Sequence, residues 1–152
     1  MEFLPPAACM QLLESEKVAH VGVTGPDGPY VTPISFVLVN GQICFRTGGG
    51  RRLDAIRAHP RVCVEVTHTS DDGLWRSVIV KGEAHETDDQ ALGRDIVAAL
   101  LHKYQAELGS PLSRGQSRPL PEPAVFVAVT PDEMTGRSSG TWFGIPSRPG
   151  RL

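Results

Sequence analysis

The distribution of apolar and polar residues along the chain predicts a protein built mainly of β-strands. Six stretches either alternate between apolar and polar positions or are rich in β-branched and aromatic residues, as strands are. These stretches are residues 18–23, 29–39, 42–47, 61–67, 75–86 and 123–130. The alternation is cleanest in 61–67, where every second residue is a valine, and one face of that strand is therefore expected to lie in the core.

Turn signals indicate how the first three strands are connected. The sequence GPDG at 25–28 is typical of a turn, because proline presets the bend and glycine accepts positive φ. Asn40 and Gly41 separate two apolar runs, which is the strongest short-range hairpin signal in the chain. The first three strands are thus expected to be antiparallel. A mostly antiparallel sheet of this size most economically closes into a small barrel, since closure removes unpaired edges.

Three segments have helical patterns. Residues 7–16 follow two prolines, and 50–59 stop at a third proline. The longest helix is expected to start at a capping box, in which the Thr87 hydroxyl accepts from the N–H of Gln90, and to end at Gly109. Its apolar positions predict a single stripe against the core: Leu92, Ile96, Leu100 and Tyr104, with Val97 and Leu101 beside them.

Composition narrows the possible functions. The chain has 152 residues, 40% of them apolar, and a formal net charge of −2, which favours one folded domain and disfavours binding to nucleic acid. We expect a cytoplasmic protein, because the sequence contains neither a membrane-length apolar run nor the features of a secretory signal. Three cysteines without C-x-x-C spacing favour free thiols over disulfides or a zinc site, and Cys44 and Cys63, which fall on strands, are expected to be buried. We place the domain at 1–137 and a Gly- and Pro-rich tail at 138–152.

The stretch FRTGGGRRLDAI, from 45 to 56, has the features of an anion site. Three glycines let the backbone approach an anion closely, and the N–H groups at the start of the following helix point toward it. Thr47 can donate a hydroxyl, and Arg51 and Arg52 add guanidinium groups suited to phosphate oxygens. Two arginines at a helix start are also commonly just solvated, and the local sequence alone leaves both interpretations open.

Several motifs occur in an order that resembles one known family. They are PY followed by PISF, then FRTGGGRRLDAI, HPRVCVEV, WRSVIVKGEA and a final TGR at 135–137. Over about residues 9–137 the chain resembles the pyridoxamine 5′-phosphate oxidase-like, FMN-binding split-barrel family. The resemblance implies a six-stranded antiparallel split β-barrel of Greek-key type with two or three flanking helices. It also implies a homodimer with FMN bound at the subunit interface.

The resemblance assigns roles to individual residues. It implies that the flavin phosphate is bound at the strand end and glycine loop by Arg46, Thr47, Gly50, Arg51 and Arg52. It implies that the isoalloxazine ring lies along the second strand, at Thr32, Pro33, Ile34 and Ser35. It further implies that the other subunit supplies a polar contact at Ser77, with Trp75 and Arg76 adjacent.

Two other features bear on this assignment. Pro33 falls in the middle of a predicted strand, where its missing N–H would cost a hydrogen bond to a neighbouring strand. Nothing is lost if this stretch faces a ligand, lies at an open edge of the sheet or forms a bulge. The dimer is expected to cover apolar strand surface such as Val78, Val80 and Phe126.

The chain also departs from the true pyridoxamine-phosphate oxidases. It lacks their C-terminal Arg-x-His and has Val37 where relatives carry lysine, so it is closer to the branch of nitroimidazole-resistance-type and flavin or deazaflavin reductases. No side-chain pattern identifies a catalytic residue, since a flavin carries its own redox chemistry. Three hypotheses remain: an FMN-dependent oxidoreductase, a reductase using the deazaflavin coenzyme F-420, and a non-catalytic flavin- or haem-binding module.

Overall fold

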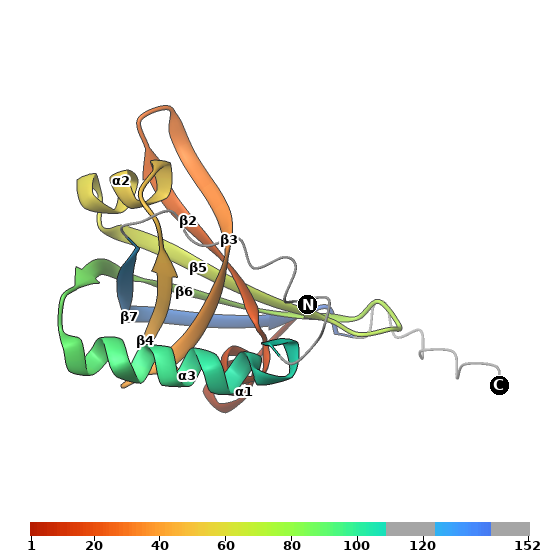
Figure 1. The fold of residues 1–152 in the computed structure, drawn as a ribbon. Coiled ribbons are helices and arrows are strands. Elements are labelled where there is room, and N and C mark those ends of the chain that lie inside the picture. The colour runs from red at the N-terminus through yellow and green to blue at the C-terminus, as the bar shows by residue number, and fades with distance from the viewer. Residues whose placement is uncertain (109–123, 141–152) are drawn as a thin grey trace.

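The computed structural model describes residues 1–108 and 124–140, with side chains for all of these except 105–108. In chain order the described elements are β1 (Glu2–Phe3), α1 (Pro6–Ser15), β2 (Val18–Gly25), β3 (Gly28–Val39), β4 (Gln42–Thr47), α2 (Arg51–Ala58), β5 (Arg61–Thr69), β6 (Trp75–Thr87), α3 (Gln90–Leu108) and β7 (Val125–Ser138). Figure 1 shows the strands wrapped around a common interior, with α1 and α2 toward opposite ends.

The strands form one antiparallel sheet that closes on itself. Their order is β1-β7-β4-β3-β2-β5-β6, and an additional pairing of β6 with β7 completes the ring. Strands β2 to β7 therefore make a closed six-stranded barrel, which confirms the predicted fold class, while β1 adds two residues beside β7. Because two strands separate β3 from β6 in either direction around the ring, these two strands lie on opposite sides of the barrel.

The predicted β3–β4 hairpin is confirmed. Asn40 and Gly41 both have positive φ, at 51° and 75°, as a two-residue type I′ turn requires. The last strand is longer than the predicted 123–130, because β7 continues to Ser138 through the polar segment PDEMTGRS. Pairing with β6 over most of its length keeps that segment extended, although its sequence has no strand-like alternation.

The barrel interior contains the main core. Inward positions of the strands are filled by valine, isoleucine and phenylalanine side chains, and Phe36 and Phe45 are fully buried. Val78 and Val80 belong to this interior, so the prediction that a second subunit covers them was wrong. The reason is strand alternation: both valines are on the inward side of β6, and the outward side carries Ser77, Ile79 and Lys81 instead.

Helix α3 covers the outer face of β3, β4 and β7 and forms a second core there. Its Ile96 is fully buried, with Leu92 and Leu100 beside it, which confirms this part of the stripe. They pack on Val37, Val39, Cys44 and Ala128, and the partly buried Phe126 joins this cluster rather than a free surface. Val97 and Leu101 are 43% and 54% exposed, so the prediction that they face the core was wrong. They lie too far around the helix to face the sheet.

The start of α3 also differs from the predicted capping box. The carboxylate of Asp89 accepts from the N–H groups of Ala91 and Leu92, at 2.8 and 3.3 Å. The Thr87 hydroxyl accepts instead from the N–H of Asp89, the residue before the helix, at 3.2 Å. Asp89 is therefore the residue that caps the helix, and an aspartate is as good an N-cap as a threonine. None of the helices in the described parts of the chain has the length and hydropathy needed to span a bilayer.

Candidate functional site

The side chain of Arg52 connects three elements at one end of the barrel. Arg52 is the second residue of α2, and its Nη1 donates to Thr32 Oγ1 at 2.9 Å and to the carbonyl oxygen of Pro33 at 3.2 Å, both on β3. Its Nη2 donates to Thr47 Oγ1 at the end of β4, at 2.9 Å. The structure thus brings together four of the residues that the sequence assigned to a flavin site.

The guanidinium of Arg52 is partly buried without a compensating negative charge. All its hydrogen-bond acceptors in the described residues are neutral oxygens, and its Nε is buried with no partner among them. Burial lowers the pKa of Arg52, although the group stays charged at any physiological pH. Desolvating a cation without an anionic partner is costly, so this arrangement is suited to binding an anion.

The loop before α2 leaves the start of the helix open to a ligand. Gly50 is the N-cap residue, with φ 130° and ψ −173°, and no side chain caps the helix. A Cβ added at Gly49 or Gly50 would meet no atom within 4 Å, so the loop borders open space. The first N–H groups of α2 and their partial positive charge therefore face a region that an anion can enter.

Thr47 is buried at the predicted phosphate site, whereas Arg51 and Arg46 are exposed. Thr47 is buried, and its hydroxyl donates to the carbonyl of Gly48 at 3.1 Å while accepting from Arg52. This hydroxyl therefore positions the arginine and the loop. Arg51 is exposed, with its guanidinium carbon 5.5 Å from the centroid of the Tyr30 ring. Arg46 is also exposed and lies on the opposite face of β4 from Thr47, since neighbours on a strand alternate.

The structure explains the proline in the middle of β3. Pro33 is paired with His20 of β2, but its carbonyl accepts from Arg52 and so points away from β2. The N and O atoms of one strand residue point to the same side, so the N–H that proline lacks would also point away from β2. Strand β4 pairs with β3 only over residues 36–39, which leaves the preceding part of β3 with an open edge beside Arg52. Pro33 thus lies at an open edge, one of the three alternatives left open by the sequence.

The neighbours of Pro33 on β3 alternate in the same way. Ile34 points into the core, whereas Ser35 is exposed on the outer face. Only the backbone of Ile34 is therefore available at the edge of the strand.

The second predicted group, on β6, lies away from Arg52 within the chain. Ser77 donates to Glu65 Oε1 at 2.7 Å, and Glu65 Oε2 lies 3.3 Å from His20 Nδ1. Trp75 donates its backbone N–H to Ser139 Oγ at 3.1 Å, and Arg76 is exposed. Because β3 and β6 are on opposite sides of the barrel, a single chain does not bring Ser77 and Arg52 together.

Sequence reasoning overlooked Glu65, the centre of this polar cluster. A signal was available, because Glu65 occupies an outward position of the alternating strand β5, between two positions filled by core valines.

The described residues hold no cluster of three or more His, Cys, Asp or Glu side chains that could bind a metal ion. Cys44 is buried as predicted, and burial raises its pKa to about 11. Cys63 was predicted to be buried but is only partly so, because it lies on the outward side of β5. Trp142 and Phe143, in the Gly- and Pro-rich tail, lie outside the described residues.

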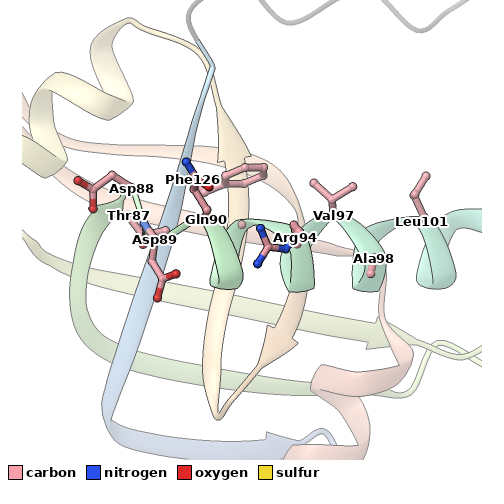
Figure 2. A pocket seen from close by; sticks show the side chains of 10 residues that line it. Thr87, Asp88, Asp89, Gln90, Arg94, Val97, Ala98, Leu101 and Phe126 are labelled. Carbon is pink, nitrogen blue, oxygen red and sulfur yellow. Dashed lines mark hydrogen bonds between the residues drawn. The ribbon is translucent and has the colours of Figure 1, made fainter.

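A separate pocket of about 670 Å³ lies where β6 meets α3. Figure 2 shows Val97, Leu101 and Phe126 along its apolar side, with Asp88, Asp89 and Arg94 around the helix start. It shares no lining residue with the surroundings of Arg52, and its mixed lining has no feature that selects a particular ligand.

Fold and site together define a closed antiparallel barrel with a cationic loop at a strand-to-helix junction. The family model described as pyridoxamine 5′-phosphate oxidase matches residues 5–138. The chain therefore belongs to that family, as the sequence motifs suggested.

Solved structures with the same fold agree with this assignment. An FAD-binding protein from Mesorhizobium loti is 25% identical, with a TM-score of 0.71 and coverage of 91% of this chain and 97% of the other. The FAD-binding protein from Mycobacterium smegmatis is 26% identical, with a TM-score of 0.61 over 90% and 98% of the two chains. A putative 5-nitroimidazole antibiotic resistance protein from Bacteroides thetaiotaomicron is 18% identical and shares the fold, with a TM-score of 0.70 over 90% and 86%.

Proposed function

We propose that this protein is an FMN-dependent oxidoreductase that works as a homodimer. The observation that carries the proposal is the guanidinium of Arg52, which is partly buried, lies over the Phe45 ring and, among the described residues, donates only to neutral oxygens and leaves its Nε without a partner. A phosphate is the kind of group that such a fork binds well, through charge-assisted hydrogen bonds.

The residues present fit a flavin mononucleotide. Arg52, Arg51 and the first N–H groups of α2 would hold the phosphate, while Thr47 and Thr32 orient Arg52 through their hydroxyls. The open edge of β3 around Pro33 offers unpaired backbone beside that phosphate position, where the ring system would lie. When bound, the flavin supplies the electron and hydride transfer, and the protein supplies binding, orientation and exclusion of water. Relatives with a similar fold are described as FAD-binding proteins, which favours a flavin in this chain as well.

Two observations support the homodimer. The two groups of expected flavin contacts lie on β3 and β6, which two other strands separate in either direction around the barrel, and this favours a flavin site shared between two copies. The outer face of β2, β3 and β6 also exposes apolar side chains: Val31 is 62% exposed, Val18 50% and Ile79 38%. These outward residues take the place of Val78 and Val80 in the expected interface.

A spectrum and a release assay test the cofactor. The purified protein, incubated with FMN and desalted, is expected to be yellow and to release FMN on denaturation. A colourless protein that binds only coenzyme F-420 would instead support the deazaflavin hypothesis. A haem absorption band, or a folded protein that binds none of these molecules, would support the non-catalytic hypothesis.

A substitution on the outer face tests the dimer. Val31→Glu places a charge in the centre of the proposed interface, and we expect light scattering to show a monomer that retains less flavin. Val97→Glu, on the exposed side of α3, is the matched control and should leave the dimer intact. A wild-type protein that is monomeric at micromolar concentration with FMN bound would contradict this part of the proposal.

A further inference from the structure

A glycine interrupts the outer face of the barrel in the middle of strand β2. Gly22 lies on the outward side of β2, where it is the cross-strand partner of Val31 on β3 and of Cys63 on β5. Glycine in the interior of a strand weakens that strand, because it has no side chain to pack and loses more backbone freedom on folding than other residues. Its presence at this position therefore calls for a cause, and a positive φ, a bulge, crowding or the close approach of another molecule are the usual ones.

The structure rules out the causes that lie within the described chain. Gly22 does not have a positive φ, and the pairing of β2 with β3 runs without a bulge from Val18 to Gly25. Among the described residues, the nearest neighbours of a Cβ added at Gly22 would be atoms of Cys63 and Val31 at 3.6 to 3.9 Å, which are ordinary van der Waals distances. The approach of another molecule is the cause that remains.

The missing side chain leaves a hollow in the outer face of the sheet, which we call the Gly22 hollow. It has a volume of about 450 Å³ and extends over β2, β3, β5 and β6. Its lining combines small and apolar residues, Gly22, Val31 and Cys63, with charged ones, Glu65 and Lys81. Val31 is 62% exposed, which makes it the most exposed large apolar side chain on strands β2 to β7. A projecting side chain and a hollow thus lie next to each other on one face.

This arrangement fits a second copy of the same chain. In a twofold pair the same surface of both copies meets, so a projecting side chain requires a nearby hollow to receive its counterpart. Val31 and Gly22 meet this requirement, since they are direct neighbours across β2 and β3. The charges around the hollow are compatible with such a pair, because Glu65 and Lys81 bring both signs to the same surface and a single sign would repel its own copy.

We propose that Val31 of each copy enters the Gly22 hollow of the other, and that these two contacts form the centre of the dimer interface. The inference rests on the proposed homodimer and adds the contact that sets how the two copies align. Two sheets that face each other are commonly about 10 Å apart, a spacing filled by interdigitated side chains, so a valine opposite a glycine fits that space. The thiol of Cys63, which is partly exposed in a single chain, is then covered by the second copy.

Exchanging the two side chains tests the contact. Gly22→Val fills the hollow, and Val31→Gly removes the projecting side chain. Each change should weaken the dimer roughly 100-fold, because a twofold interface contains each contact twice and losses of about tenfold per contact multiply. The double variant places the projecting side chain on β2 and the hollow on β3, so its dimer dissociation constant should return to within about tenfold of the wild-type value. Sedimentation velocity at several protein concentrations measures these constants, and urea unfolding shows that each variant is folded.

The Cys63 thiol gives a second measurement that needs no variant. Cys9 and Cys44 are buried within the fold, so a maleimide reacts with the folded protein at Cys63. Its labelling rate should fall roughly tenfold as the wild-type concentration rises through the dimer dissociation constant, because the second copy covers the thiol. In Gly22→Val the rate should stay constant over the same range of concentrations.

The outcomes separate this contact from the proposed function. A double variant whose losses simply add, a labelling rate of wild-type Cys63 that does not depend on concentration, or a dimer that Gly22→Val leaves unchanged would overturn the contact. If the protein is still yellow and dimeric in that case, the proposed function stands and only this contact is wrong. A small molecule that co-purifies with the wild type and is lost in Gly22→Val, with the dimer unchanged, would assign the hollow to that ligand instead. A wild type that is monomeric with FMN bound would overturn both the homodimer and the contact.

Discussion

The arginines at the two ends of helix α2 have opposite electrostatic surroundings. Arg57, in the last turn, donates from Nε and Nη2 to the two carboxylate oxygens of Glu86, at 2.8 and 2.7 Å. Arg52, in the first turn, is partly buried, and its hydrogen-bond acceptors among the described residues are all neutral oxygens. The pKa of Arg57 is raised by Glu86, whereas the pKa of Arg52 is lowered by burial. Within the part of the chain that the structure describes, Arg57 has a carboxylate partner and Arg52 has none.

The contrast is the basis for our proposal that Arg52 binds a ligand and that Arg57 has a structural role. An exposed ion pair such as Arg57–Glu86 contributes little to stability and requires no ligand. A desolvated cation costs stability, and a protein that retains one commonly uses it, as perturbed groups cluster at functional sites. The position at a helix N-terminus, behind a glycine loop, favours an anion as the proposed ligand.

Replacing Arg52 with alanine should weaken FMN binding about 100-fold. That factor corresponds to about 3 kcal/mol, which is typical of losing charge-assisted hydrogen bonds to a phosphate. Quenching of FMN fluorescence measures the dissociation constant. Arg57→Ala, on the same helix, is the control and should change it less than about twofold. Equal losses in both variants would mean that Arg52 acts only through general surface charge.

Replacing Arg52 with lysine should have an intermediate effect. Lysine keeps the positive charge but cannot bridge Thr32, Thr47 and a phosphate at once, because it lacks the planar fork. We expect the dissociation constant for FMN to rise roughly tenfold. Titrations at low and high salt should show that the lysine variant depends on ionic strength more than the wild type does. An affinity equal to that of the wild type would show that charge alone is enough at this position.

Replacing Gly50 with alanine should destabilise the loop. Its φ of 130° and ψ of −173° lie in a region that is nearly exclusive to glycine, so the cost is about 1–3 kcal/mol. Urea unfolding should show this loss, and FMN affinity should fall with it. Gly49→Ala is the matched control, because Gly49 also faces open space but has no positive φ. If Gly49→Ala and Gly50→Ala behave alike, backbone geometry is not what shapes the anion site.

The smallest effect concerns the Arg57–Glu86 pair. The hydrogen bonds that Arg57 donates to Glu86 lower the pKa of Glu86 from 4.5, so the folded protein favours the carboxylate form. The stabilisation by this pair is complete above pH 4.5 and is lost as the pH falls through the lower folded value. Glu86→Gln should therefore be slightly less stable than the wild type at pH 7, and the difference should shrink in acid. Urea unfolding of the two proteins, at pH 7 and at a pH below the folded pKa of Glu86, measures the difference in stability. A difference that grows in acid would contradict the ion pair.

Much of the barrel could be predicted from local sequence signals. The β3–β4 hairpin followed from Asn40-Gly41, and the inward face of β5 followed from its alternating valines. The second half of β7 could not be predicted as strand, because its polar residues are held in place by pairing with β6, a contact distant in sequence. The inward direction of Val78 and Val80 was misjudged for a related reason. Alternation shows which residues share a face, but closure of the sheet decides which face is inside.

The residue types of the candidate site could be predicted from the sequence, but the contacts between their side chains could not. The glycines and arginines of 48–52 favoured an anion site from local sequence, and that interpretation stays a prediction. That Arg52 is the desolvated arginine and Arg51 the exposed one depends on where α2 lies against β3, which no local pattern reveals. The role of Thr47 as a partner of Arg52, and the open edge at Pro33, likewise depend on the pairing of β3 with β4.

The most direct test of the account compares FMN with riboflavin, which lacks the phosphate, in wild-type protein and in Arg52→Ala. Fluorescence titration gives the four dissociation constants. We predict that the wild type binds FMN about 100-fold more tightly than riboflavin, and that the variant loses this preference while its affinity for riboflavin stays within about twofold. A variant that keeps the preference for FMN, or a wild type that shows no preference, would contradict the claim that Arg52 binds the phosphate of FMN.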